Sequence, residues 1–317
     1  MADGMNKPSD APSAAWASIW YAGKRVLVTG GTGFVGLRTV RALQAAGHRV
    51  RIFDLAPKPE RLSVMDGVEI VSGDITDAAA VAKAADGCNG IVHLVGLMTV
   101  DCACSPALGT RVNLLGSINV FEAAKAKRLP VAYLSSAGVF GLDDAVNPRP
   151  MTVYGATKLA VEGMARAYLL DHGIPSLGLR PYIVYGPGES AGIAAGPSIA
   201  LGAAVRREPA EIRFSGRVGF VYVDDVARML STAMTVPLEG ATVLTMAGDT
   251  VEMTDFVAEL SHQSGWNEIR ISGPPLRIPA DLASDPVPHI LGNQPVTTVS
   301  NGIARALAEL KETAGVE

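Results

Sequence analysis

The stretch RVLVTGGTGFVG, residues 25–36, decides the fold of this 317-residue sequence. Its first half, RVLVTG (25–30), is a β-rich run that glycine stops, which is typical of a buried strand. GFVGLRTVRALQAAG (33–47) then has apolar residues at helical spacing and ends at Gly47, as helices commonly do. The sequence therefore predicts a strand that turns through glycines directly into a helix.

Strand-like and helix-like segments continue to alternate beyond this unit. The further expected strands are 48–54, 68–74, 90–96, 129–136 and 175–181, and the further expected helices are 76–87, 107–127 and 153–173. Strands separated by helices pair in parallel through right-handed crossovers. The predicted fold class is therefore α/β, with a doubly wound parallel Rossmann sheet.

Three glycines in the first turn fit the pyrophosphate of a dinucleotide, which binds backbone N–H groups at a helix N-terminus. Gly30 allows the tight turn, Gly33 leaves room for the phosphates, and Gly36 lets the helix approach closely. The residues of this turn expected to contact the cofactor are Gly30, Thr32, Gly33, Phe34, Val35 and Gly36.

Asp54, at the end of the second expected strand, distinguishes between the two nicotinamide dinucleotides. A carboxylate here accepts hydrogen bonds from the adenosine ribose and repels a 2′-phosphate, so NAD is favoured over NADP. NADP remains the alternative because Arg38, Lys58 and Arg61 are near in sequence. A further cofactor contact is expected at Asp74 and Ile75, at the adenine; a structural turn is the other reading of Asp74.

Tyr154 and Lys158 are four residues apart on one expected helix, so both side chains emerge from the same face. A tyrosine pKa of about 10 is too high for a base near neutrality, and a nearby ammonium group lowers it. The pair can exchange a proton with a substrate while nicotinamide exchanges a hydride. Lys158 is also expected to hold the nicotinamide ribose.

Ser135 and Ser136 end the fifth expected strand, at the edge where open α/β sheets bind ligands. Ser136 is the candidate that orients the substrate oxygen toward Tyr154, and Ser135 is expected to hydrogen-bond locally. Ser136, Tyr154 and Lys158 are thus the predicted catalytic residues.

The chain is expected to divide into three parts: a lead-in (1–23), the dinucleotide-binding Rossmann domain (24–181), and a smaller substrate-binding lobe interleaved with it (182–317). The lead-in lacks the charged start and apolar middle of a signal peptide. Its Trp16 and Trp20 are expected to dock on the chain's own sheet, with a subunit contact as the alternative.

Composition excludes several classes of protein. The net charge of −4 gives no basic surplus for nucleic-acid phosphates, and 48% hydrophobic residues exclude wholesale disorder. Three cysteines give no disulfide framework and five scattered histidines no zinc spacing, so a cytoplasmic location and no metal are expected. The most apolar stretch, 90–100, is too short to span a membrane, so no membrane partner is expected.

Eight motifs together resemble the extended short-chain dehydrogenase/reductase superfamily, in its NAD-dependent epimerase/dehydratase group. They are VTGGTGFVG (28–36), GDITD (73–77), VHLVG (92–96), RVNLLGSINVFEAA (111–124), LSSAGVFG (134–141), YGATK (154–158), LRPYIVYGPG (179–188) and FVYVDDVA (220–227). The resemblance covers roughly Lys24 to Arg305 and implies a Rossmann sheet of about seven strands.

This resemblance also implies where the site lies. The family's catalytic residues fall on Ser136, Tyr154 and Lys158, and its backbone contacts near nicotinamide fall around Leu94, Val95, Gly96 and Pro181. Homodimers are usual in the family, through helices that would include 107–127 and 153–171 here.

Two departures from the family pattern concern the substrate. Sugar-nucleotide members often have an asparagine where Ile183 stands, and Arg-Asp where Val218 and Gly219 precede Phe220. Both groups face the nucleotide in those members, so a substrate without a nucleotide is favoured. The expected substrate contacts are Met98, Ser136, Ala137, Tyr154, Tyr182, Ile183 and Arg217.

Other polar residues are expected to be structural. His93 falls in a buried strand, Asn113 is expected to bond backbone, and Asp224 and Asp225 are expected to cap a helix. Cys102 follows the fourth strand, near where substrate would enter.

The sequence leaves three hypotheses. The first is an NAD-dependent dehydrogenase of a small polar alcohol, sugar or sugar acid. The second is a sugar-nucleotide epimerase, with dehydration weaker because Ala137 and Gly138 follow Ser136 without an acidic residue. The third is a non-catalytic NAD-binding regulator, which the presence of both Tyr154 and Lys158 makes the least favoured.

Overall fold

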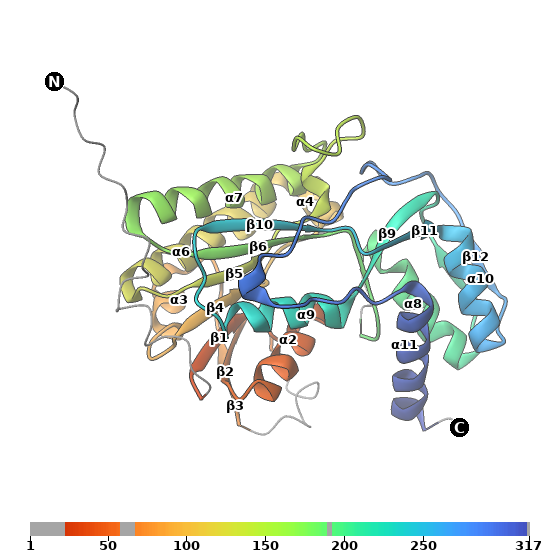
Figure 1. Cartoon of the computed structure of the whole chain (residues 1–317), viewed down its shortest axis with the longest axis horizontal. Helices are drawn as coiled ribbons and strands as arrows, with labels where there is room; N and C mark the ends of the chain where they lie inside the picture. Colours follow the sequence, from red (N-terminus) through yellow and green to blue (C-terminus); the bar gives the residue numbers. More distant parts are fainter. Residues whose placement is uncertain (1–22, 58–66, 189–191, 316–317) are drawn as a thin grey trace.

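A computed structural model of the chain describes residues 23–57, 67–188 and 192–315. A broad sheet flanked by helices forms one part of the molecule, and a smaller lobe lies beside it (Figure 1). Trp16, Trp20, Lys58 and Arg61 lie outside the described residues, so the expectations for them stay predictions. Within the described ranges no helix is both long and apolar enough to cross a membrane.

The large sheet has seven strands in the order β10-β6-β5-β4-β1-β2-β3, and every neighbouring pair is parallel. Its strands are β1 (Arg25–Thr29), β2 (Arg49–Asp54), β3 (Val68–Ser72), β4 (Gly90–His93), β5 (Val131–Leu134), β6 (Ser176–Pro181) and β10 (Ala241–Met246). The predicted doubly wound α/β class is confirmed. The strand order reverses between β1 and β4, which is where such sheets bind ligands at their carboxyl edge.

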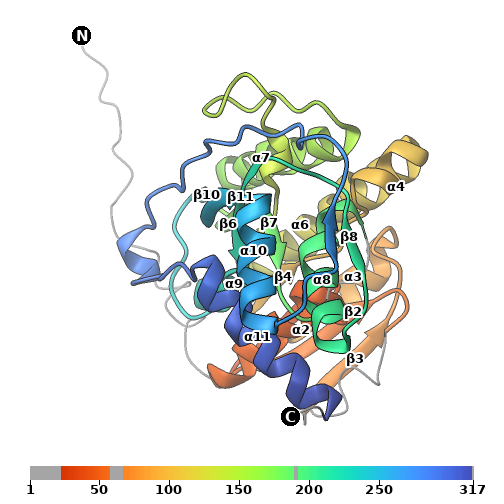
Figure 2. The same ribbon diagram turned by 90° about the vertical axis from the view of Figure 1, so that its right-hand side faces the viewer.

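Helices cover both faces of this sheet, as the two views in Figures 1 and 2 show. One face carries α3 (Ala78–Ala84), α6 (Gly116–Lys127) and α7 (Val153–His172), and the other carries α2 (Phe34–Ala45) and α9 (Val223–Ala233). Separate apolar cores lie under the two layers: Phe121 and Tyr133 belong to the first, Val28 and Leu43 to the second.

The smaller lobe faces the viewer in Figure 2 and is built entirely from the later half of the chain. Its elements are β7 (Ile183–Tyr185), α8 (Gly196–Arg206), β8 (Ala210–Ile212), β9 (Arg217–Tyr222), β11 (Asp249–Glu252), α10 (Met253–Ser264), β12 (Ile269–Ile271) and α11 (Val299–Ala314). They form a three-stranded sheet, β11-β9-β7, and a two-stranded one, β12-β8, with helices packed against them.

The edge strand β10 was not among the expected strands, because the chain returns to the large sheet only after entering the smaller lobe. It pairs with β6 along its whole length, from Ala241 with Ser176 to Met246 with Pro181. A later segment covers its free edge: Asp285 bonds Thr245 twice, and the Ser284 hydroxyl accepts the Ala247 N–H.

The long helix expected over 107–127 is wrong in detail. The structure has α5 (Pro106–Thr110), a π-helical turn (Arg111–Leu115) and then α6, preceded by a short helix α4 (Thr99–Cys104). Close packing accompanies the interruption, since a Cβ at Gly109 would lie 2.8 Å from Cys102 Sγ and one at Gly116 would lie 2.9 Å from Ile75. Single π-turns inside helices are frequent at functional sites.

Candidate active site

The glycine turn between β1 and α2 has the tight form that the sequence predicted. Gly30 has a φ of +72°, which favours glycine, and a Cβ there would lie 3.1 Å from the Val95 nitrogen. At Gly36 a Cβ would lie 2.2 Å from the Gly30 carbonyl oxygen, so only glycine lets α2 lie this close to the turn.

The N-terminus of α2 fits an anionic ligand. Gly33 is its N-cap, no side chain caps the helix, and its first turn contains no acidic residue. The partial positive charge and the N–H groups of this helix end are therefore available to a phosphate group. The residues present thus fit the pyrophosphate of a dinucleotide.

Asp54 lies at the end of β2, beside this turn. Its Oδ2 accepts the Thr32 hydroxyl at 2.6 Å and the Thr32 N–H at 3.2 Å. Arg38, which the sequence left as a possible partner of a 2′-phosphate, is engaged elsewhere, in a two-point contact with Glu309. This arrangement is consistent with NAD. Among the described residues, Arg38 is bound to Glu309 and gives no support for NADP.

The segment that follows β3 is held by hydrogen bonds of Asp74 and Ile75. Asp74 Oδ1 accepts both the N–H and the hydroxyl of Thr76 at 2.8 Å, which is a local turn. Ile75 is 4% exposed, and Asn119 of α6 donates to its carbonyl at 2.9 Å. An adenine contact at Asp74 and Ile75 stays a prediction.

Ser136, Tyr154 and Lys158 come together beyond the carboxyl end of β5. The Ser136 hydroxyl is hydrogen-bonded to Tyr154 and also accepts the Gly138 N–H at 3.0 Å. Lys158 Nζ lies 5.7 Å from the centroid of the Tyr154 ring and donates to the Leu134 carbonyl at 2.8 Å. Both Tyr154 and Lys158 are buried.

The expected lowering of the tyrosine pKa by the lysine is not seen. Burial raises the pKa of Tyr154, and the hydrogen bond from Ser136 acts against this without reversing it. Burial also lowers the pKa of Lys158 to about 8. Desolvation disfavours the charged form of each group, and it is the largest cause of both pKa shifts.

Gly155 sets the distance between Tyr154 and Ser136, a role that the sequence analysis missed. A Cβ at Gly155 would lie 2.1 Å from the Gly138 carbonyl oxygen, so only glycine lets α7 begin against the turn after Ser136. Thr152 caps α7 by accepting the Gly155 N–H at 3.0 Å. Gly155 is the second residue of the YGATK motif, and this motif could have indicated its importance.

Asn113 fixes the loop after β4. Its Oδ1 accepts the Leu97 N–H at 2.7 Å, and its Nδ2 donates to the Leu97 carbonyl at 3.0 Å and to Thr157 at 3.3 Å. The expectation that Asn113 bonds backbone is confirmed. Gly96 lies close to the active-site lysine, because a Cβ there would lie 3.2 Å from Lys158 Nζ.

His93 is a satisfied buried histidine, as expected. Its ring bonds the Thr29 hydroxyl at 2.7 Å and the Ser117 hydroxyl at 3.0 Å, and burial lowers its pKa to about 3. Ser117 donates to the Asn113 carbonyl within the π-turn. The chain of contacts therefore joins β1 and β4 to the π-turn through neutral groups.

Two other expectations about polar residues were wrong. Ser135 does not bond locally: its hydroxyl donates to Glu162 of α7, which also holds Arg180 through two contacts. Asp224 and Asp225 do not cap α9, because its N-cap is Tyr222 and no side chain caps it.

These two carboxylates instead bind side chains and backbone, most of them from distant parts of the chain. Asp224 pairs with Arg38 at 3.6 Å, and Asp225 accepts the N–H and hydroxyl of Thr297 and a guanidinium N–H of Arg228.

The expected substrate contacts fall in different environments. Met98 is 45% exposed, whereas Ala137 and Ile183 are buried. The Tyr182 hydroxyl donates to the Ile278 carbonyl at 3.3 Å, and half-exposed Arg217 pairs with Asp281 at 3.8 Å. Leu94 follows β4 and Pro181 ends β6, the two strands on either side of β5, with Val95 and Gly96 directly after Leu94.

The fold, the glycine turn and the residues at the sheet edge define a nicotinamide-dependent enzyme of the extended short-chain dehydrogenase/reductase class. The chain belongs to the NAD-dependent epimerase/dehydratase family, whose sequence profile matches residues 26–246. The prediction of NAD as the cofactor is thereby confirmed.

Curated relatives include epimerases and a dehydrogenase. A probable UDP-glucuronate 4-epimerase of Rhizobium meliloti (strain 1021) is 28% identical over 332 residues, covering 89% of this chain and 95% of that protein. UDP-glucuronate 4-epimerase 5 of Arabidopsis thaliana is 33% identical over 53% of this chain, and the match spans only 43% of the plant protein. A 3 beta-hydroxysteroid dehydrogenase/Delta 5-->4-isomerase of Mycobacterium tuberculosis is 30% identical over 80% of this chain and 73% of its own length.

Solved structures share the fold over nearly the whole chain. UDP-glucose 4-epimerase from Thermus thermophilus, in complex with NAD, has a TM-score of 0.76 at 26% identity, covering 90% of this chain and 99% of that one. UDP-glucose 4-epimerase from Thermotoga maritima has a TM-score of 0.82, 92% and 99% coverage and 23% identity, which supports the fold alone.

Proposed function

We propose that this protein transfers a hydride between NAD and a hydroxyl-bearing carbon of a small polar alcohol, sugar or sugar acid. The observation that carries the proposal is the meeting of Ser136, Tyr154 and Lys158 beside Gly96 at the carboxyl edge of the sheet. The carboxyl edge of the sheet therefore brings together a group that can transfer a proton (Tyr154), a hydroxyl (Ser136) and a cation (Lys158).

The cofactor is proposed to lie along this edge. Its pyrophosphate would be held by the turn of Gly30 to Gly36, its adenosine ribose by Asp54, and its nicotinamide end by the backbone of 94–96 and by Lys158. When bound, NAD supplies the ring that accepts or returns the hydride. For Asp54 to bind the ribose, its hydrogen bonds to Thr32 would be replaced by hydrogen bonds to the ribose hydroxyls.

Tyr154 is proposed to move the proton. In the oxidative direction the substrate hydroxyl would lose its proton to the phenolate form of Tyr154 as the C–H bond gives up a hydride, and in the reductive direction the neutral phenol would donate that proton. Ser136 would hold the substrate oxygen at hydrogen-bonding distance from Tyr154. Lys158 would steady the nicotinamide ribose with its ammonium group.

Three positions that face the nucleotide in sugar-nucleotide relatives carry no polar side chain here, which favours a substrate without a nucleotide. Ile183 is 3% exposed within the main apolar core, and Val218 is 1% exposed. Gly219 has no space for a side chain, because a Cβ there would lie 1.9 Å from the Ala247 carbonyl oxygen. None of these three positions offers a polar side chain to a diphosphate.

A sugar-nucleotide 4-epimerase is the second candidate, because the Rhizobium relative, a probable UDP-glucuronate 4-epimerase, matches over 95% of its length. Tyr154 would begin that reaction in the same way. The resulting ketone would then present its other face and take the hydride back, so no net oxidation would occur. Dehydration is disfavoured, since Ala137 and Gly138 follow Ser136.

The deciding experiment measures the cofactor that the purified protein carries. Denatured protein is analysed for NAD(H) and NADP(H) per chain, and the native protein is then screened with NAD against free sugars, sugar acids and UDP-sugars. An empty site together with NAD reduction by a free sugar or sugar acid supports the dehydrogenase. About one retained NAD per chain together with UDP-sugar interconversion replaces it with the epimerase.

We further propose a cytoplasmic homodimer in which the partner covers the outer surfaces of α6 and α7. Exposed apolar side chains on and beside these helices support it: Leu115 is 42% and Leu170 is 72% exposed. Sedimentation equilibrium tests the assembly, and a monomer at micromolar concentration would contradict it. The division of the chain at residue 181 into a cofactor domain and a substrate lobe belongs to the same proposal.

A further inference from the structure

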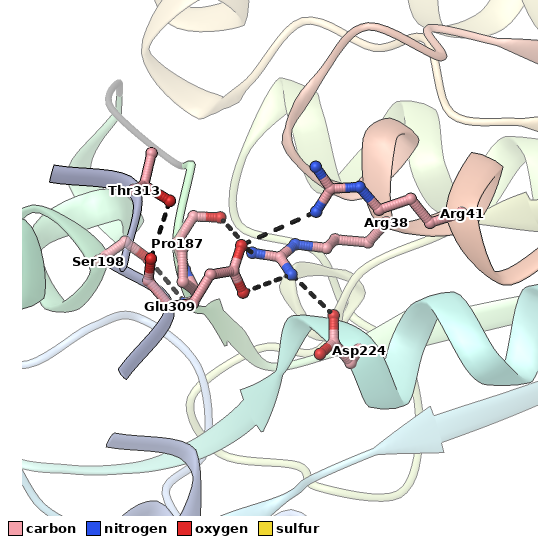
Figure 3. A network of polar contacts seen from close by, with 8 residues as sticks. Arg38, Arg41, Pro187, Ser198, Asp224, Glu309 and Thr313 are labelled. Carbon is pink, nitrogen blue, oxygen red and sulfur yellow. Dashed lines mark hydrogen bonds and ion pairs between the residues drawn. The ribbon is translucent and has the colours of Figure 1, made fainter. Parts of the chain in front are cut away.

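A single arginine of the nucleotide-binding helix joins the two halves of the molecule. Arg38 lies one turn into α2, and its side chain is only 10% exposed. Its guanidinium donates to both carboxylate oxygens of Glu309, at 2.8 and 2.6 Å, and to the Pro187 carbonyl at 3.3 Å, and pairs with Asp224 at 3.6 Å (Figure 3).

These partners come from three separate elements. Glu309 belongs to α11, Asp224 to the first turn of α9, and Pro187 to the turn that follows β7. Arg41, one turn further along α2, approaches Glu309 only at 3.8 Å and is half exposed. Arg38 is therefore the buried residue at the centre of this polar network.

The turn at Pro187 borders the phosphate-binding turn. A Cβ at Gly188 would lie 3.7 Å from the ring of Phe34, the first residue of α2, so the two segments lie close together. On its other side, the Gly186 N–H donates to Ser198 of α8 at 3.1 Å. Arg38 thus fixes this turn to the same helix whose N-terminus fits the pyrophosphate.

We propose that Arg38 is a positioning residue that sets how slowly NAD leaves, by holding α11 and the 186–188 turn against the phosphate-binding turn. A planar guanidinium can bond both carboxylate oxygens through two parallel N–H groups and a carbonyl as well, a two-point geometry that the single nitrogen of lysine does not reproduce. Removing the cation leaves Glu309 with only the longer contact to half-exposed Arg41, and Asp224 without its ion pair to α2, so α11 and the 186–188 turn separate from α2. The proposal concerns the cofactor alone and does not depend on the identity of the substrate.

The experiment measures cofactor release directly, without substrate. Protein loaded with NADH is mixed with excess NAD, and the loss of bound-NADH fluorescence gives the dissociation rate. We expect Arg38→Met to speed dissociation by about tenfold or more, the size of effect that losing a charged hydrogen-bonded pair produces. Glu309→Gln is expected to give a smaller increase, and Arg38→Lys a partial return toward the native rate.

Controls separate this effect from a general loss of stability. Arg41→Met removes a charge from the same helix face and is expected to leave dissociation unchanged. Phe121→Leu weakens the core on the opposite face of the sheet, and is expected to lower the melting temperature without changing release.

The proposal is overturned if folded Arg38→Met releases NADH at the native rate, or if Phe121→Leu accelerates release as much. Should Arg38→Met fail to fold, the comparison of Glu309→Gln with Arg41→Met decides the matter, and equal rates for these two variants reject the proposal.

Discussion

Lys158 carries an electrostatic cost that the fold tolerates at its active site. Its pKa is about 8 in the folded protein and 10.5 in an unfolded chain, so below pH 8 a charged ammonium is buried. Between pH 8 and 10.5 the unfolded chain binds a proton that the folded protein has lost. Stability contributed by this group therefore rises with pH across that window and is lowest below pH 8.

We expect Lys158→Met to be more stable than the native protein at pH 7. The pKa difference corresponds to about 3 kcal/mol, and the lost bond to the Leu134 carbonyl offsets about 1 kcal/mol, leaving a gain of about 2 kcal/mol. Denaturant unfolding at pH 7 and pH 10 measures it. A gain that is equal at the two pH values would show that burial of the charge is not its cause.

Tyr154→Phe is expected to lower turnover on the true substrate by about 10²–10⁴-fold, since that is the usual contribution of a general acid or base. Cofactor binding should persist, because the ring remains. Burial raises the pKa of native Tyr154, so oxidation, which needs a proton acceptor, should speed up as pH rises, and reduction should slow. Full activity in the phenylalanine variant would reject the proposed mechanism.

At this scale the sequence predicted residues that a motif places on one helix or at one strand end. Tyr154 and Lys158 share a helix face, and Asp54 ends β2, the strand that follows the glycine turn and its helix. It failed for Ser135, Asp224 and Asp225, whose partners Glu162, Arg38 and Thr297 come from other elements. A sequence motif indicates a local cap, whereas the choice among distant partners is made by packing.

At the scale of the element, α7 begins where a single glycine allows it to. We expect Gly155→Ala to destabilise the protein by about 1–3 kcal/mol, because the new methyl group would overlap the Gly138 carbonyl. It should also lower turnover by separating Tyr154 from Ser136. Urea unfolding and steady-state kinetics measure the two effects.

Gly163→Ala is the matched control on the same helix, since nothing lies within 4 Å of a Cβ there. It should raise stability by about 1 kcal/mol through helix propensity and leave turnover unchanged. The role of Gly155 would be refuted if both alanine variants behaved alike.

The π-turn at Arg111–Leu115 presents Asn113 to the loop after β4. Asn113→Leu would leave the half-buried N–H of Leu97 without its side-chain partner and the Leu97 carbonyl with only the weak contact from Cys102 Sγ, at a cost of about 1–3 kcal/mol. We expect faster amide hydrogen exchange in residues 94–98 and weaker NAD binding. Unchanged exchange there would contradict this role.

The helical periodicity of 107–127 could not reveal this turn, because an inserted residue changes the register without changing the composition. Its cause is tertiary: Asn113 finds its partners in Leu97 and Thr157, and Gly116 lies against Ile75. Periodicity predicted that the segment is helical, and contacts decide where the helix is interrupted.

At the scale of the molecule, the outer edge of β10 is protected by a later segment. Asp285→Ala removes the acceptor of the Thr245 N–H, and an uncovered edge strand pairs readily with other chains. We expect faster hydrogen exchange over Ala241–Met246 and more aggregation on heating. Asp281→Ala, at a 91% exposed side chain on the same segment, is the control. Equal behaviour of the two variants would count against the edge-covering role.

Most of the large sheet follows from the sequence because six of its strands come in chain order, and within the described residues helices lie in four of the five connections between them. The seventh does not, since β10 comes after the β7 to β9 region, where short strands among glycine, alanine and proline give a weak pattern. The position of the smaller lobe beside the large sheet depends on contacts such as that of Arg38 with Glu309, which link residues far apart in the chain.

The late return of β10 has a consequence for protein synthesis. When β6 leaves the ribosome its outer edge is still unpaired, and its partner strand begins about 60 residues later. At roughly 5–20 residues per second, that interval lasts several seconds. During it the nascent chain exposes an open parallel edge, so this is the stage at which chaperones are needed and at which a stalled or truncated chain would aggregate.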